Sequence, residues 1–110
     1  MSKREPKQDL LQGTLDLIVL RTLDTMGPQH GLGLARRIGQ ISEGALDLNQ
    51  GTLYPALLRL EQRGWIRAVK STNDRRQPYS LKAEGRRYLE EQLAELGGIV
   101  KAGLRRLRHA

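Results

Sequence analysis

The chain contains no cysteine and no phenylalanine, and it has only one tryptophan and three tyrosines among its 110 residues. Without cysteine, neither a disulfide framework nor a thiolate metal site is possible. The two histidines, His30 and His109, lie far apart in the sequence and cannot form a zinc site alone. The core of this single domain must be aliphatic, and its high leucine content favours helices over a β-sandwich.

Long apolar runs and catalytic patterns are missing as well. No apolar run approaches the roughly 18 residues of a membrane span, and the segment Met1–Pro6 lacks the apolar stretch of a signal peptide. We therefore expect a cytoplasmic protein without membrane contact. We also find no nucleophile–base pair, phosphate loop or metal cluster. The sequence predicts neither enzymatic activity nor a cofactor or metal.

The positive charge is concentrated in two parts of the chain. The formal net charge is +7, but residues 10–63 carry five basic and five acidic side chains. Residues 64–81 have four basic side chains against one acidic, and residues 82–110 have seven against four. Such focused potential suits a polyanion, either nucleic acid or an anionic membrane surface. The alternative is a basic soluble protein without such a partner.

A 3.6-residue spacing of apolar residues predicts three helices in the first part of the chain. They cover residues 10–26, about 31–41, and a third stretch that is capped by Asn49 or Thr52 and runs to Arg63. Because Pro55 is costly beyond the first turn, the third helix should start near Thr52 or bend there. The residues expected to face inward are Leu11, Leu15, Ile18, Val19 and Leu23, then Leu34, Ile38 and Ile41, then Leu53, Leu57, Leu58 and Leu60.

After Gly64, which should end the third helix as a C′ residue, the period changes from 3.6 to 2. We expect a strand over Trp65–Lys70 and a returning strand over Arg75–Leu81. Pro78 should make the second strand an edge, since proline cannot donate to a ladder. Residues 82–108 form a long helix with a coiled-coil spacing of apolar residues. This seam predicts dimer contacts by Leu89, Leu93, Leu96, Val100 and Leu107.

The order of these elements predicts a mainly α fold with a two-stranded β-wing: a winged helix-turn-helix with a long C-terminal dimerisation helix. We assign residues 1–9 to a flexible basic arm and residues 10–81 to the DNA-binding domain. Residues 82–110 form the dimerisation helix. Double-stranded DNA and a second copy of the chain are the expected partners.

The second helix of a helix-turn-helix lies in the major groove with its N-terminal residues at the base edges. In this chain the candidate contacts of that helix are Asn49, Gln50, Gly51, Thr52, Tyr54 and Arg59. Lys70, Arg75 and Arg76 of the wing suit a phosphate or the minor groove, and Arg36 and Arg37 suit phosphates.

Each of these assignments has a structural alternative. Asn49 and Thr52 would then only cap a helix, and Tyr54 would only pack. The wing would be a solvated turn, and Arg59 and Arg63 would reach the backbone or an acidic neighbour rather than a base. Trp65 is expected to seal the core, with a platform for a flat effector as the alternative.

Four segments carry a resemblance to a known family. From about residue 10 to residue 90, and in this order, the chain closely resembles the PadR family of transcriptional regulators in Leu11–Leu17, Gly27–Gly31, Gly51–Leu57 with Arg59-Leu60-Glu61, and Tyr79-Ser80-Leu81 followed by Gly85. The single C-terminal helix resembles the short subfamily. The resemblance implies a homodimeric winged-helix repressor that binds a palindromic promoter site and responds to a small molecule.

Two positions depart from the family pattern, and one family residue has no counterpart. Leu32 replaces a tyrosine, and Lys82 replaces a threonine that would cap the last helix. Residues 82–110 contain no tryptophan, whereas family members that hold planar drugs use one there. Two other functions stay open at this point: a winged-helix protein-interaction module and an unspecific architectural DNA binder.

Overall fold

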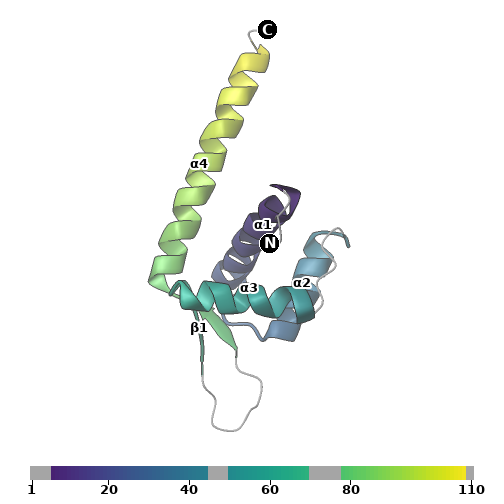
Figure 1. Cartoon of the computed structure of the whole chain (residues 1–110). Helices are drawn as coiled ribbons and strands as arrows, with labels where there is room; N and C mark the ends of the chain where they lie inside the picture. The colour runs from purple at the N-terminus through teal and green to yellow at the C-terminus, as the bar shows by residue number, and fades with distance from the viewer. Residues whose placement is uncertain (1–5, 45–49, 70–77, 109–110) are drawn as a thin grey trace.

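A computed structural model of the chain describes residues 6–44, 50–69 and 78–108 (Figure 1). The described elements, in order, are α1 (Pro6–Met26), α2 (Gly31–Ile41), α3 (Gln50–Gln62), β1 (Ile66–Ala68), β2 (Tyr79–Leu81) and α4 (Ala83–Arg108). This order confirms the predicted fold class, which is mainly helical with a two-stranded antiparallel sheet and a long C-terminal helix. Within these ranges no helix is both long and apolar enough to cross a membrane.

The core lies where α1 contacts α2, α3, β2 and the first turns of α4. We refer to α1, α2, α3 and the β1–β2 hairpin together as the head. The buried apolar side chains are Leu15, Val19, Leu20 and Leu23 of α1, Leu34 and Ile38 of α2, Leu53, Ala56, Leu57 and Leu60 of α3, Ile66 of β1 and Leu89 of α4. The core is aliphatic, as the composition predicts.

Two residues predicted to face inward are exposed instead. Ile41, at the end of α2, is 57% exposed, and Leu58 of α3 is 56% exposed. Helix α3 buries one stripe that runs through Leu53, Leu57 and Leu60. Leu58 follows Leu57 by one residue and therefore lies about 100° around the helix, outside that stripe.

Two helix starts differ from the prediction. Helix α1 begins at Pro6, so residues 6–9 belong to this helix and not to an arm. Proline suits the first position of a helix, since its missing N–H would have no partner there. Helix α3 begins at Gln50, two residues before the expected start near Thr52, and it contains Pro55.

Gly64 ends α3 in a left-handed conformation with a φ of +76°, which confirms its predicted role. The Trp65 N–H donates to the Leu60 carbonyl at 3.1 Å, and the Gly64 N–H donates to the Glu61 carbonyl at 3.0 Å. This pair of bonds is a Schellman motif. It turns the chain sharply from α3 into β1.

The β1–β2 hairpin pairs Ile66 with Leu81 and Ala68 with Tyr79, and both strands are shorter than predicted. On its other side, Tyr79 exchanges two backbone hydrogen bonds with Gln29, of 2.8 and 3.0 Å. In the two-stranded sheet β2 is an edge strand, as predicted, and the isolated bridge with Gln29 covers this edge at Tyr79. The wing tip lies at residues 70–77, outside the described residues.

The start of α4 is fixed by contacts with Trp65, which compensate for the weak cap. The Lys82 N–H donates to the Trp65 carbonyl at 2.9 Å, and a Cβ at Gly85 would lie only 2.2 Å from that carbonyl oxygen. The Trp65 ring stacks on Tyr88 with 3.9 Å between the centroids. This stacking, at the edge of the core, is consistent with the predicted sealing role of Trp65.

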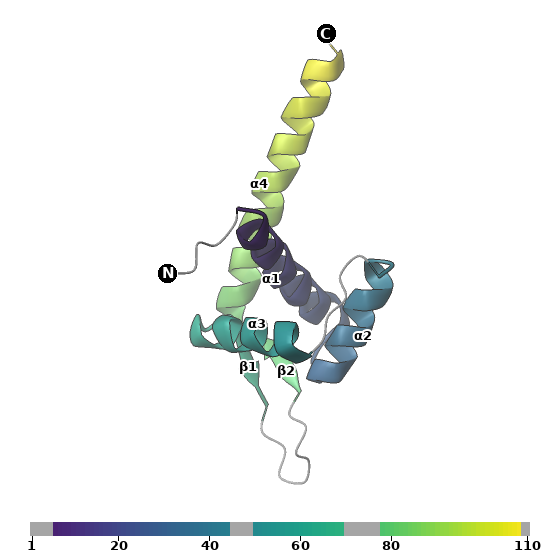
Figure 2. The ribbon, with the colours of Figure 1, turned by 45° about the vertical axis from the view of Figure 1, so that its right-hand side comes forward.

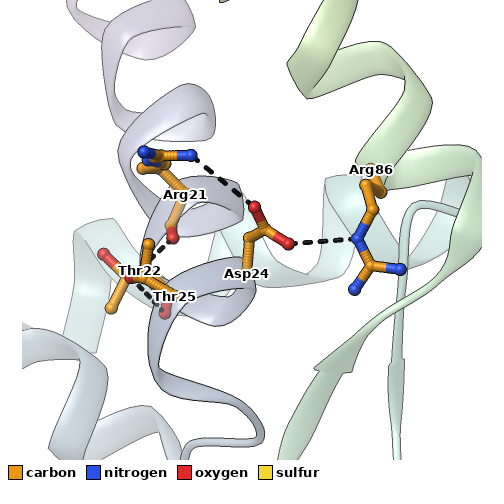
Figure 3. A network of polar contacts seen from close by, with 5 residues as sticks. All are labelled: Arg21, Thr22, Asp24, Thr25 and Arg86. Carbon is orange, nitrogen blue, oxygen red and sulfur yellow. Dashed lines mark hydrogen bonds and ion pairs between the residues drawn. The ribbon is translucent and has the colours of Figure 1, made fainter.

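Two further contacts hold α4 on the head. In Figure 3, Asp24 of α1 accepts a hydrogen bond from Arg86 Nε at 3.0 Å, and Arg21 approaches the other carboxylate oxygen at 3.6 Å. Leu89 is 1% exposed and packs in the core of the chain. The prediction that Leu89 forms a dimer contact is therefore wrong. Beyond this point α4 projects away from the head (Figures 1 and 2).

Candidate nucleic-acid interface

Helix α3 crosses the head with one face buried and the opposite face open to solvent. Gly51, Pro55, Leu58 and Gln62 follow one another at intervals of four, three and four residues, and all four are exposed. These spacings place them on one side of the helix, opposite the buried leucines. We refer to Gly51, Pro55, Leu58 and Gln62 as the outer face of α3. Thr52, also exposed, lies beside it.

The sequence left two interpretations of Tyr54 open, a DNA contact and a packing residue, and its position in the structure is compatible with both. A Cβ at Gly31 would meet its hydroxyl oxygen at 3.4 Å and its ring carbons at 3.5 and 3.6 Å. The ring therefore packs on the first residue of α2. It is nevertheless 46% exposed, so part of it remains accessible to a ligand.

Arg59 is bound to a carboxylate within the head. Its Nη2 donates to Asp16 Oδ1 at 2.5 Å, and its Nε donates to Oδ2 at 3.4 Å. The Arg59 side chain is 24% exposed and that of Asp16 is 10% exposed. Of the alternatives for Arg59, the structure shows the acidic neighbour, so the expected DNA contact is replaced by a bond between α3 and α1.

Arg63 also has a partner inside the chain. Its guanidinium carbon lies 5.0 Å from the centroid of the Trp65 ring, within the range of a cation–π contact. Because Arg63 is exposed, this contact is weaker than the Asp16–Arg59 pair. It occupies the tryptophan ring that would otherwise serve as a platform.

The other predicted contacts fall into two groups. Arg36 and Arg37 are exposed on α2, and Gln50 is the first residue of α3. Asn49 and the wing residues Lys70, Arg75 and Arg76 lie outside the described residues. The structure therefore brings Gly51, Thr52 and Tyr54 together on α3, whereas the wing contacts stay predictions.

Sequence reasoning did not find Asp16 or Tyr79. The pKa of Tyr79 is raised above 10.0 by burial, by Glu61 and by Tyr54, so its hydroxyl is held in the neutral form. Asp16 could have been found from its position beside Leu15 on a stripe of apolar residues, because a buried carboxylate needs a partner. Across the part of the chain that the structure describes, no group of three histidine, aspartate or glutamate residues could hold a metal ion.

Three packed helices, a hairpin after the third and a projecting last helix define a winged helix-turn-helix protein. Residues 19–91 match the Transcriptional regulator PadR-like family. The chain belongs to this family, which confirms the resemblance seen in the sequence.

Solved structures of related proteins share the fold. A transcriptional regulator from Clostridium thermocellum is 28% identical, with a TM-score of 0.74 over 86% of this chain and 90% of its own. A PadR-like transcription factor from Bacteroides fragilis is 25% identical, with a TM-score of 0.71 over 87% and 92%. A PadR family regulator from Clostridium difficile is 30% identical, with a TM-score of 0.67 over 82% and 94%.

A relative without an assigned function, from Lysinibacillus sphaericus, is 27% identical over 92 residues, which are 81% of this chain and 84% of that protein. Together with the family match, the solved structures make the chain a DNA-binding transcriptional regulator and not an enzyme.

Proposed function

We propose that the chain is a homodimeric repressor that places one α3 helix of each subunit in the major groove of a palindromic promoter site. The observation that carries this proposal is an apolar stripe on the projecting part of α4. Its members lie three or four residues apart and are 41–74% exposed: Leu93, Leu96, Val100, Leu104 and Leu107. Such a seam on a helix that extends past its own core fits a helical partner.

The charges of α4 support a second copy as that partner. Glu90, Glu91 and Glu95 make the first half of the projecting helix acidic, whereas Lys101, Arg105 and Arg106 make the second half basic. All six side chains are exposed. Parallel pairing would set like charges side by side, whereas antiparallel pairing sets the acidic half of each helix near the basic half of its partner. The helix dipoles favour the same arrangement. An antiparallel pair also separates the two heads, as two half-sites require.

Release of the repressor by a small molecule belongs to the proposal on the family resemblance alone. The aromatic residue of α4 is Tyr88, and it stacks on Trp65 within the subunit. A stacked effector site would therefore have to differ from the tryptophan site of drug-binding family members.

The repressor is tested by titrating the promoter fragment upstream of its own gene, at physiological salt, against a scrambled duplex. Tighter binding to the promoter and less transcript from it in vitro are expected. Equal affinity for both duplexes would indicate an unspecific architectural binder, and no binding to either would indicate an interaction module. Increased transcription would contradict repression. Replacing Arg75 and Arg76 by alanine should lower the salt slope by about one unit for each lost phosphate contact.

The dimer is tested by sedimentation of Leu96→Asp, with Ala94→Asp as the control. Both changes add one carboxylate to an exposed position of α4, but only Leu96 lies on the apolar stripe. Leu96→Asp should be monomeric and should bind the promoter weakly, while Ala94→Asp should remain a dimer. A dimeric Leu96→Asp would contradict the assigned seam.

A further inference from the structure

We infer that the outer face of α3 recognises DNA through the methyl groups of thymine, and that Leu58 is a specificity-determining residue. The inference rests on the proposed function, in which α3 enters the major groove.

The first observation is the position of Leu58. A single exposed leucine is ordinary on a protein surface. Leu58, however, lies opposite the buried stripe of α3 and is 56% exposed, on the same side of the helix as Pro55. With the exposed part of Tyr54 at the edge, these side chains form an apolar patch on the helix that would face the bases.

The second observation concerns charge. Within Gln50–Gln62 the single basic residue is Arg59, and its guanidinium is bound by both carboxylate oxygens of Asp16. The other charged residue, Glu61, lies close enough to Tyr79 to raise its pKa. Arginine or lysine on guanine is the commonest specific contact in the major groove. Helix α3 therefore has no basic side chain available to make this contact with guanine.

These observations favour one feature of the bases. The thymine methyl group is the apolar feature that base pairs present in the major groove, and apolar side chains recognise it by direct contact. Removing one methyl group from water changes affinity about four-fold, which corresponds to ~0.8 kcal/mol. One or two such contacts in each half-site would therefore give a measurable preference for thymine.

The test starts from duplexes that the wild-type dimer selects from a random pool. In the selected site, each thymine is replaced in turn by uracil, which lacks only the methyl group. Wild type should lose about four-fold in affinity at one or two positions of each half-site. Leu58→Ala should bind the thymine duplex more weakly by a similar factor and should be insensitive to uracil at one of those positions.

Ile41→Ala is the matched control, because Ile41 is 57% exposed but lies on α2. It should retain both the affinity and the full penalty for uracil, and sedimentation should show that Leu58→Ala is still a dimer. If replacing thymine by uracil left the affinity of wild type unchanged at every position, the inference would be overturned. A uracil penalty that is unchanged in Leu58→Ala would overturn the role of Leu58. If no sequence were enriched, the proposed function would fail, and this inference with it.

Discussion

The Asp16–Arg59 pair should contribute strongly to stability, although it joins only two side chains. It links α1 to α3 by two hydrogen bonds, and the side chains are 10% and 24% exposed. Removing one partner leaves the other charge largely buried without compensation. We therefore expect Asp16→Leu and Arg59→Met each to destabilise the head.

The magnitude follows from the burial of the pair. Breaking a fully buried pair costs about 3–5 kcal/mol, and exposed pairs contribute about 0–1 kcal/mol. Because Arg59 keeps some exposure, we expect a loss of about 2–3 kcal/mol for each single substitution, or roughly 10 °C in Tm for a domain of this size. The double variant Asp16→Leu with Arg59→Met replaces both charges by apolar groups and should recover most of the loss.

Urea denaturation at one fixed protein concentration measures these differences, since the stability of the proposed dimer would depend on concentration. Arg86→Met is the matched control, because Arg86 is 52% exposed and Asp24 keeps its second ion pair, with Arg21, so the loss should be less than ~1 kcal/mol. Equal effects of Arg59→Met and Arg86→Met, or additive losses in the double variant, would refute the argument. The double variant should also keep the wild-type salt slope of DNA binding, because the Arg59 guanidinium is bound to Asp16.

Two other predictions concern the α4 junction and Tyr79. Gly85→Ala should destabilise the chain by about 1–3 kcal/mol in thermal unfolding, because the new Cβ would lie 2.2 Å from the Trp65 carbonyl oxygen; an unchanged Tm would mean that α4 does not need this close approach. Burial, with help from Glu61 and Tyr54, raises the pKa of Tyr79 in the folded chain above 10.0. The stability that comes from its neutral hydroxyl should be complete below about pH 10 and lost as the pH rises through the folded pKa, and a Tyr79→Phe variant with the same alkaline unfolding profile would contradict this.

The sequence was sufficient for the elements because their signals are local. Each signal is carried by residues close together in the sequence. The period of apolar residues changes at Gly64, Gly64 itself has a left-handed conformation, and the leucines of α4 recur every three or four residues. The start of α4 was less predictable, because Lys82 is a poor cap. Its start is fixed by the carbonyl of Trp65, which is distant in the sequence.

The candidate site was harder to predict because its residues are defined by tertiary partners. Arg59 fits a phosphate contact by its position on α3, and only the approach of Asp16, 43 residues earlier, shows that its charge is occupied. Tyr54 likewise fits a base contact, but its ring also packs on Gly31. Helical spacing gives the side of a helix on which a residue lies, and the neighbouring elements decide what that side contacts.

Leu58 and Leu89 show how this limit bears on function. Both are leucines on amphipathic helices, yet the one expected in the core is exposed and the one expected at the dimer contact is buried. Leu89 lies in the stretch of α4 that packs on the head, so its burial holds the projecting helix to the DNA-binding unit. In the proposed dimer the seam would therefore start at Leu93. Because Leu89 packs α4 on the head, the orientation of α4 in such a dimer would also set the position of α3. Spacing between the two half-sites would then depend on the α4 seam, while the choice of bases would depend on the outer face of α3.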